Sequence, residues 1–199
     1  MRISRAYGLI FLPNPKCAST TVERYIDVYT EGEAEAPTGY PRHVDATILD
    51  HYMEAEALSY DDFLVFTTIR NPWDRLVSLW EYAKTRPDSV WFEAANSSET
   101  LSEFLHSDIV KVEFASKFGL HGFTHTSDGR RVVDDVFCVE EYASALPLMF
   151  RRVGIDFVDT GLRVNPSDRD GYRSYFDDAD RDLVADLFAV DIEYGNYTF

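Results

Sequence analysis

The stretch of this 199-residue chain with the most suggestive chemistry runs from Phe11 to Thr21, with the sequence FLPNPKCASTT. A Pro-Asn-Pro segment separates an apolar run from one lysine, Lys16, and from three hydroxyl side chains, Ser19, Thr20 and Thr21. Backbone N–H groups at the start of a helix are unpaired, and the helix dipole favours negative charge there. A lysine and hydroxyl donors beside such a helix start therefore predict a loop that binds phosphate or sulfate.

A second stretch with the chemistry of an anion site is TTIRNPWDRLVS, residues 67–78. Arg70 follows a strand-like run, and Asn71-Pro72 is a favourable start for the helix that contains Ser78. We expect positions 71, 74, 75 and 78 to line one side of that helix. An arginine at a strand end, with a serine on that side, can bind a second phosphate. The alternative is a local ion pair between Arg70 and Asp74, with Ser78 incidental.

The elements that position these stretches alternate between strand and helix. Apolar and β-branched runs predict strands over 6–12, 63–69 and 132–139. Helical spacing predicts helices over 19–29, within 44–57, from 72 onwards, and over 101–106, 109–118, 140–153 and 177–191, with a polar loop over 163–173. Ser19 or Thr20 is expected to cap the first helix. This order predicts one α/β domain over residues 1–199, with a mostly parallel sheet and ligands at the carboxyl ends of its strands.

Composition narrows the possible partners. The net charge is −16, from 35 acidic and 19 basic residues, so nucleic acid and anionic membranes are poor partners. Only four lysines occur, and an anionic ligand would be drawn to a local basic pocket. We expect no transmembrane span and no signal peptide. Two cysteines give neither a disulfide framework nor metal-ligand spacing, which favours a cytoplasmic setting. The oligomeric state is not predicted.

The segments PKCASTT and IRNPWDRLVS resemble the two cofactor motifs of sulfotransferases that use 3′-phosphoadenosine 5′-phosphosulfate (PAPS). The similarity is greatest to carbohydrate-type members and their short bacterial and phage relatives, and it continues weakly through 137–154 and the tail from 165 to 197. The resemblance implies a P-loop-NTPase-like sheet flanked by helices. It also implies transfer of a sulfuryl group from PAPS to a hydroxyl of a glycan or small-molecule acceptor, with no metal.

The resemblance further implies a role for individual residues. Lys16 would contact the bridging oxygen of the phosphosulfate and stabilise charge as the sulfuryl group leaves. Arg70 and Ser78 would hold the 3′-phosphate, and Arg173, in a loop that closes over the nucleotide in relatives, is a second candidate for that phosphate. The 5′-phosphate would be held by the backbone of Cys17 and Ala18 and by Ser19, Thr20 and Thr21.

An acceptor hydroxyl must lose a proton, so a general base is expected near Lys16. His43 matches a histidine at that place in carbohydrate-type relatives, and the unperturbed pKa of histidine suits the role. The alternative is an exposed loop histidine. Glu113 and Glu140 are carboxylate alternatives. The remaining histidines, which we expect to be surface or core residues, are His51, His106, His121 and His125.

Several departures and rival functions also follow from the sequence. Cys17 stands where a threonine, serine or valine is more usual, Ala18-Ser19 lies in a region often richer in glycine, and an arginine common near 138–140 is missing. A P-loop kinase would need G-x-x-x-x-G-K-[ST], but this loop has no glycine and its lysine precedes the hydroxyls. A phosphatase with Cys17 as nucleophile would need an arginine where Glu23 stands. A domain that binds the nucleotide without transferring a group is the third rival.

Overall fold

A computed structural model describes residues 1–161 and 171–199 of the chain, which divide into two compact units. Unit 1 contains residues 1–69 and the segment that begins at 121. Unit 2 contains residues 70–120 and the C-terminal segment that ends at 199. Most of the polar loop predicted over 163–173 lies outside the described residues, as does the start of the tail similarity at 165.

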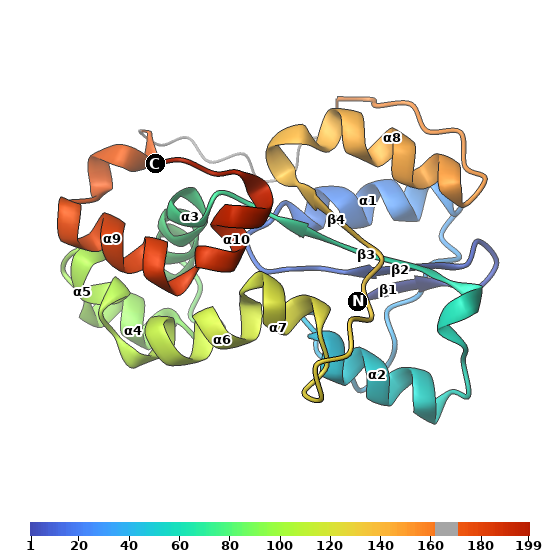
Figure 1. The fold of residues 1–199 in the computed structure, drawn as a ribbon, viewed down its shortest axis with the longest axis horizontal. Helices are drawn as coiled ribbons and strands as arrows, with labels where there is room; N and C mark the ends of the chain where they lie inside the picture. The colour runs from blue at the N-terminus through green and yellow to red at the C-terminus, as the bar shows by residue number, and fades with distance from the viewer. Residues whose placement is uncertain (162–170) are drawn as a thin grey trace. The chain divides into compact units, whose positions relative to one another are not determined.

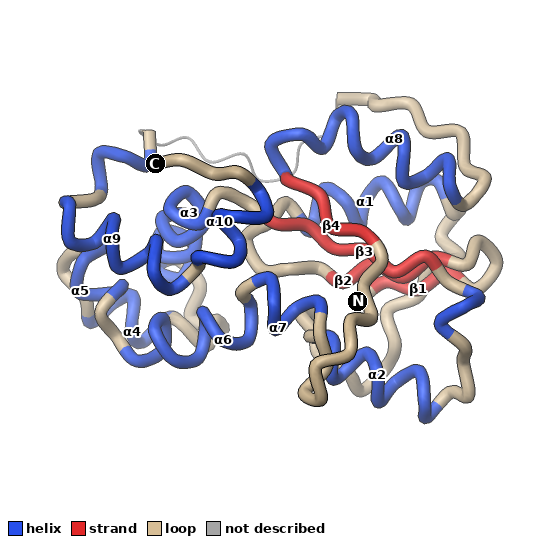
Figure 2. Tube along the Cα trace, viewed as in Figure 1, coloured by secondary structure: helices blue, strands red, loops and turns tan. Residues whose placement is uncertain are grey.

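Unit 1 is built around a four-stranded sheet of order β1-β2-β3-β4, drawn in red in Figure 2. Its strands are β1 (Arg2–Ser4), β2 (Leu9–Leu12), β3 (Leu64–Ile69) and β4 (Asp135–Cys138). β1 pairs antiparallel with β2, whereas β2, β3 and β4 run parallel. Every residue of β2 and β3 is buried, as expected for parallel strands covered on both faces. The predicted mostly parallel α/β fold is confirmed.

Helices cover both faces of this sheet. α1 (Ser19–Tyr29) and α8 (Tyr142–Arg152) lie on one face, and α2 (Ala46–Ala55) lies on the other (Figure 1). On the first face, aromatic side chains from strand and helix share one core, including Phe11, Tyr25, Phe66 and Phe150. α7 (Leu120–Thr124) begins at the unit boundary and leads into a hairpin arm that turns at Gly129. The burial of these apolar faces is the main force that holds α1 against the sheet.

Two predicted strands are shorter than expected. The predicted strand 6–12 begins only at Leu9, because Gly8 is in the left-handed region (φ 56°) and closes a hairpin with β1, which the sequence did not predict. The predicted strand 132–139 is reduced to 135–138. There the side chain of Asp134 accepts a hydrogen bond from the Val65 N–H (2.7 Å), in the place of a backbone carbonyl. Both errors are local and leave the carboxyl ends of β2 and β3 where they were expected.

The regular secondary structure of unit 2 is all helical in its described residues. It begins with α3 (Pro72–Lys84), whose core face packs into a cluster with Trp73, Leu76, Phe104, Phe114 and Phe188. The other elements of the unit, in chain order, are α4 (Phe92–Ser97), α5 (Leu101–Leu105), the π-helix η2 (Ile109–Phe114), α6 (Ala115–Phe118), the 3₁₀ helix η4 (Tyr172–Tyr175), α9 (Asp178–Leu187) and α10 (Ala189–Gly195).

The predicted C-terminal helix 177–191 is two helices, because Phe188 leaves the helical region (φ −120°) and separates α9 from α10. Its side chain is fully buried, so packing of this ring outweighs the local preference for one continuous helix. No helix of the described residues has both the length and the apolar character needed to cross a bilayer.

Candidate active site

The loop between β2 and α1 has the backbone geometry of an anion cradle. Lys16 and Ala18 both take left-handed conformations, with φ of 63° and 53°. Ala18 is also the N-cap of α1, and it makes no side-chain cap, so the cap expected from Ser19 or Thr20 is not formed. Left-handed residues that alternate with right-handed ones turn successive N–H groups toward one concave side, a geometry that suits anions. Two non-glycine residues in this region are strained, and such strain clusters at functional sites.

Buried threonines of the neighbouring strand hold this loop in place. The Thr68 hydroxyl donates to the Cys17 carbonyl (2.7 Å), and the Thr67 hydroxyl donates to the Leu12 carbonyl (2.7 Å). Both threonines are fully buried. No role was predicted for them, although two adjacent threonines in an otherwise apolar strand were a visible signal. They fix the direction of the Leu12 and Cys17 carbonyls, and the Cys17 N–H donates to the Asn14 carbonyl (3.2 Å) within the loop.

The predicted phosphate-binding hydroxyls differ in their surroundings. Ser19 is buried, and its hydroxyl donates to the Asn14 carbonyl (2.6 Å) within the loop. Thr21 is buried as well, whereas Thr20 is half-buried and accepts a hydrogen bond from Arg42 (2.8 Å). Of the three hydroxyls, the structure therefore leaves that of Thr20 nearest to solvent. The Cys17 thiol is fully buried, which does not suit a phosphatase nucleophile.

His43 is hydrogen-bonded to the start of the loop. Its Nδ1 lies 2.6 Å from the carbonyl oxygen of Pro13. A carbonyl can only accept, so Nδ1 carries the proton, and the neutral ring keeps its lone pair on Nε2. Burial of the imidazole lowers the pKa of His43 to about 4. The hydrogen bond to Pro13 opposes this shift, and the Arg42 guanidinium adds to it. His43 is therefore neutral at pH 7, with one nitrogen able to accept a proton.

The second motif lies at the start of α3 in unit 2. Asn71 caps this helix, because its side chain accepts a hydrogen bond from the Asp74 N–H (3.3 Å), and Pro72 occupies the first helical position, as predicted. Arg70 forms an ion pair with Asp74, with Nε 2.6 Å from Oδ2. The local pair named as the alternative interpretation is therefore present. Ser78 is half-buried, two turns into the helix.

Arg173 belongs to the same unit as Arg70. It is exposed and lies over the ring of Tyr172, 4.9 Å from the centroid. The hydroxyl of Tyr172 accepts a hydrogen bond from the Asn71 side chain (3.4 Å), so the short helix η4 is attached to the start of α3. The segments that carry Arg70 and Arg173 therefore meet within unit 2.

The expectation that positions 71, 74, 75 and 78 all line one side of the helix as a binding surface is wrong at Arg75. Its side chain is fully buried, donates to the Phe118 carbonyl (2.8 Å) and lies 3.8 Å from the carboxylate of Asp191. Burial raises the pKa of Asp191. This arginine is a structural residue that joins α3, α6 and α10, and removal of either partner would leave an uncompensated charge in the core.

The other candidates are surface or paired groups. Glu113 is exposed and lies 4.0 Å from Lys117, and Glu140 is exposed near the end of β4. The rings of His121 and His125 stack at 4.4 Å, and exposed His106 lies 3.4 Å from Asp180. Among residues 1–161 and 171–199, no group of three or more histidine, cysteine or acidic side chains is arranged to hold a metal ion.

The predicted site residues thus form two groups. Lys16, the 17–21 segment and His43 belong to unit 1, whereas Arg70, Ser78 and Arg173 belong to unit 2. The chain itself connects the groups, because β3 ends at Ile69 and the next residue is Arg70.

These features define an α/β protein with a lysine-bearing, anion-cradle loop between its second strand and first helix. The sequence model described as the sulfotransferase family matches residues 1–111, more than half of the chain. The chain therefore belongs to the sulfotransferase family, which supports sulfuryl transfer in general and a P-loop-like fold. The matched segment includes both motifs and His43 but not Arg173. Searches of curated proteins and of solved structures found no match.

Proposed function

We propose that this protein transfers the sulfuryl group of PAPS to a hydroxyl acceptor, a glycan or a small molecule. The observation that carries the proposal is the loop between β2 and α1, in which left-handed Lys16 and Ala18 form a backbone cradle at a helix start. These residues suit a phosphosulfate, because a left-handed loop at a helix start and a lysine within it favour an anionic ligand. A chain with only four lysines places one of them at this position.

Each residue has a defined role in this proposal. PAPS supplies an activated sulfuryl group whose bond to the 5′-phosphate breaks as the acceptor oxygen attacks. Lys16 stabilises the negative charge that develops on the phosphate oxygen. Nε2 of His43 accepts the proton of the acceptor hydroxyl. In unit 2, Arg70, Ser78 and Arg173 hold the 3′-phosphate.

The test of this proposal is the selectivity of nucleotide binding. Adenosine 3′,5′-bisphosphate, the desulfonated product, should raise the melting temperature by mass action, about 2.7 kcal/mol of stabilisation at a ligand concentration 100-fold above Kd. ATP with Mg²⁺ should give a much smaller shift, because the cradle lacks the glycines and lysine position of a triphosphate loop. Equal shifts from the two nucleotides would contradict the PAPS assignment and favour a phosphotransferase.

Arg70 provides a second, independent test. Arg70→Ala should weaken binding of adenosine 3′,5′-bisphosphate by roughly 1.5–3 kcal/mol, the scale of a charged hydrogen bond. Titration calorimetry measures the change, with adenosine 5′-monophosphate as the matched ligand that lacks the 3′-phosphate and should bind both proteins alike. Asp74→Asn releases the arginine from its ion pair and should leave binding intact or tighter. Unchanged affinity in Arg70→Ala would mean that Arg70 only pairs with Asp74 and does not bind the 3′-phosphate.

A further inference from the structure

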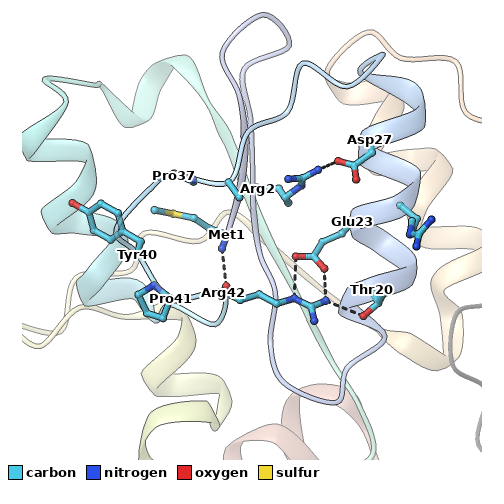
Figure 3. A pocket seen from close by; sticks show the side chains of 11 residues that line it. Met1, Arg2, Thr20, Glu23, Asp27, Pro37, Tyr40, Pro41 and Arg42 are labelled. Carbon is cyan, nitrogen blue, oxygen red and sulfur yellow. Dashed lines mark hydrogen bonds and ion pairs between the residues drawn. The ribbon is translucent and has the colours of Figure 1, made fainter. Parts of the chain in front are cut away.

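Unit 1 contains a pocket of about 380 Å³ beside the first two turns of α1. One wall is a single face of α1, formed by residues at helical spacing, Thr20, Glu23, Arg24 and Asp27. The opposite wall is the loop over 36–42, with Tyr40 between two prolines, and the start of β1 closes one side (Figure 3). The volume lies at the low end of the range for small-molecule sites, about 300–1,000 Å³, and suits a ligand no larger than one or two sugar rings.

The pocket borders both parts of the proposed reaction site. Thr20 lies two residues beyond Ala18 of the anion cradle, and Arg42, the residue before His43, donates a hydrogen bond to its hydroxyl (2.8 Å). Arg42 also forms an ion pair with Glu23, and Figure 3 shows these three side chains linked between the loop and α1. A molecule in this pocket therefore lies against the start of α1 and the segment that carries the proposed base.

The charges of the pocket favour an anionic ligand. Three of its eleven lining residues are arginines, whereas lysine and arginine together account for 19 of the 199 residues of the chain. The acidic share, two of eleven, is close to that of the whole chain, 35 of 199. Arg2 pairs with Asp27 and Arg42 with Glu23. Exposed Arg24 has no carboxylate partner among the described residues, 1–161 and 171–199, and so supplies one excess positive charge.

The apolar part of the pocket suits a ring. Tyr40 is held by an edge-to-face contact with Tyr52 of α2, with centroids 5.3 Å apart, and the two prolines beside it add rigid apolar surface. Aromatic rings offer a large contact area at low entropic cost, and the hydroxyl-rich edge of a ligand can bond to the carboxylates of Glu23 and Asp27.

We propose that this pocket binds the acceptor, and that the acceptor is a small hydroxylated compound that carries a carboxylate, which Arg24 recognises. The inference rests on the proposed sulfuryl transfer and names the substrate class for that site. Arg42 and Thr20 form the end of the pocket nearest the cradle, and the attacking hydroxyl approaches from that end. The opposite, carboxylate-bearing end of the acceptor reaches Arg24.

The experiment compares two matched probes, p-nitrophenyl β-D-glucuronide and p-nitrophenyl β-D-glucoside, which differ by a carboxylate. Binding is measured by titration calorimetry without any nucleotide, so the result does not depend on the donor. The wild type should bind the glucuronide more tightly. Arg24→Ala should lower the affinity for the glucuronide about three- to tenfold, as expected for an exposed charge pair. The affinity for the glucoside should stay unchanged. Glu23→Gln removes a negative charge that repels the carboxylate of the ligand, so it should raise the affinity for the glucuronide severalfold.

Arg151→Ala is the matched control, because Arg151 is also an exposed helical arginine of unit 1 but is not part of the pocket. It should change neither affinity. Equal binding of the two probes, no binding of the glucuronide, or an equal loss in the Arg151 variant would overturn the proposal. The shift produced by adenosine 3′,5′-bisphosphate is measured on the same proteins. If Arg24→Ala lowers the affinity for that nucleotide and not for the glucuronide, the pocket binds the donor, and the proposal is wrong. If the nucleotide fails to bind at all, the donor assignment fails, whatever the glucuronide shows.

Discussion

Lys16→Ala is expected to lower the rate of sulfuryl transfer by at least about 10²–10³, the usual cost of removing one preorganised group that stabilises developing charge. The reason is the position of the lysine in the strained loop between β2 and α1, where its backbone is left-handed. Alanine keeps the backbone arrangement, since it tolerates φ of 63° no worse than lysine does. The measurement is transfer of radiolabelled sulfate from PAPS, with circular dichroism to show that the fold is retained.

Two further variants separate chemistry from stability. Lys16→Gly removes the charge but relieves the left-handed strain, so it should be as inactive as the alanine variant and at least as stable. Lys117→Ala removes an exposed lysine of unit 2 and should keep full activity. A Lys16→Ala protein with near-normal transfer would exclude the lysine from the reaction and would return the loop to a structural role.

Much of the fold was accessible from the sequence because its signals are strong and local. β3 is a run of six buried residues, and the Asn71-Pro72 cap marks the start of α3 at the predicted residue. The short strand β1 was not predicted, because three residues carry no usable periodicity and Gly8 looked like part of an apolar strand. The break at Phe188 was missed for a different reason: it depends on where that ring packs in the core of unit 2.

Parts of the candidate site could likewise be predicted from the sequence, and other parts could not. Residue types and order made Lys16 and Arg70 candidates, because charge in a particular place along the chain is a sequence property. The left-handed backbone of the loop could not be foreseen, since nothing in PKCAST contains the glycine that usually marks such geometry. The threonines that hold the loop and the depressed pKa of His43 both depend on contacts between distant segments. Arg75, expected on the site side, is instead buried.

His43→Ala is expected to slow transfer by about 10²–10⁴-fold, the contribution of a positioned general base. His43→Asn is the informative partner, since an asparagine amide can donate to the Pro13 carbonyl in place of Nδ1 but cannot accept the proton of the acceptor. If the imidazole is the base, both variants should be equally slow. If the histidine only holds the loop through its hydrogen bond, the asparagine variant should recover most of the activity, and that recovery would contradict the role of base.

The pH dependence of the same variants tests the lowered pKa of His43 and shows whether another group titrates during turnover. The pKa of His43 is about 4 in the folded protein and about 6.5 in an unfolded chain, so the unfolded state binds more protons between these values. The stability contributed by the neutral ring is therefore full above pH 6.5 and is lost as the pH falls toward 4. The asparagine variant lacks this loss, so its melting temperature should fall less steeply from pH 7.5 to pH 5.

The wild-type kcat/KM should not fall through protonation of His43 above pH 5, because Nε2 stays unprotonated. A decline in the wild type centred near pH 6.5 would place the titrating group elsewhere, and it would remove His43 as the base in the free enzyme.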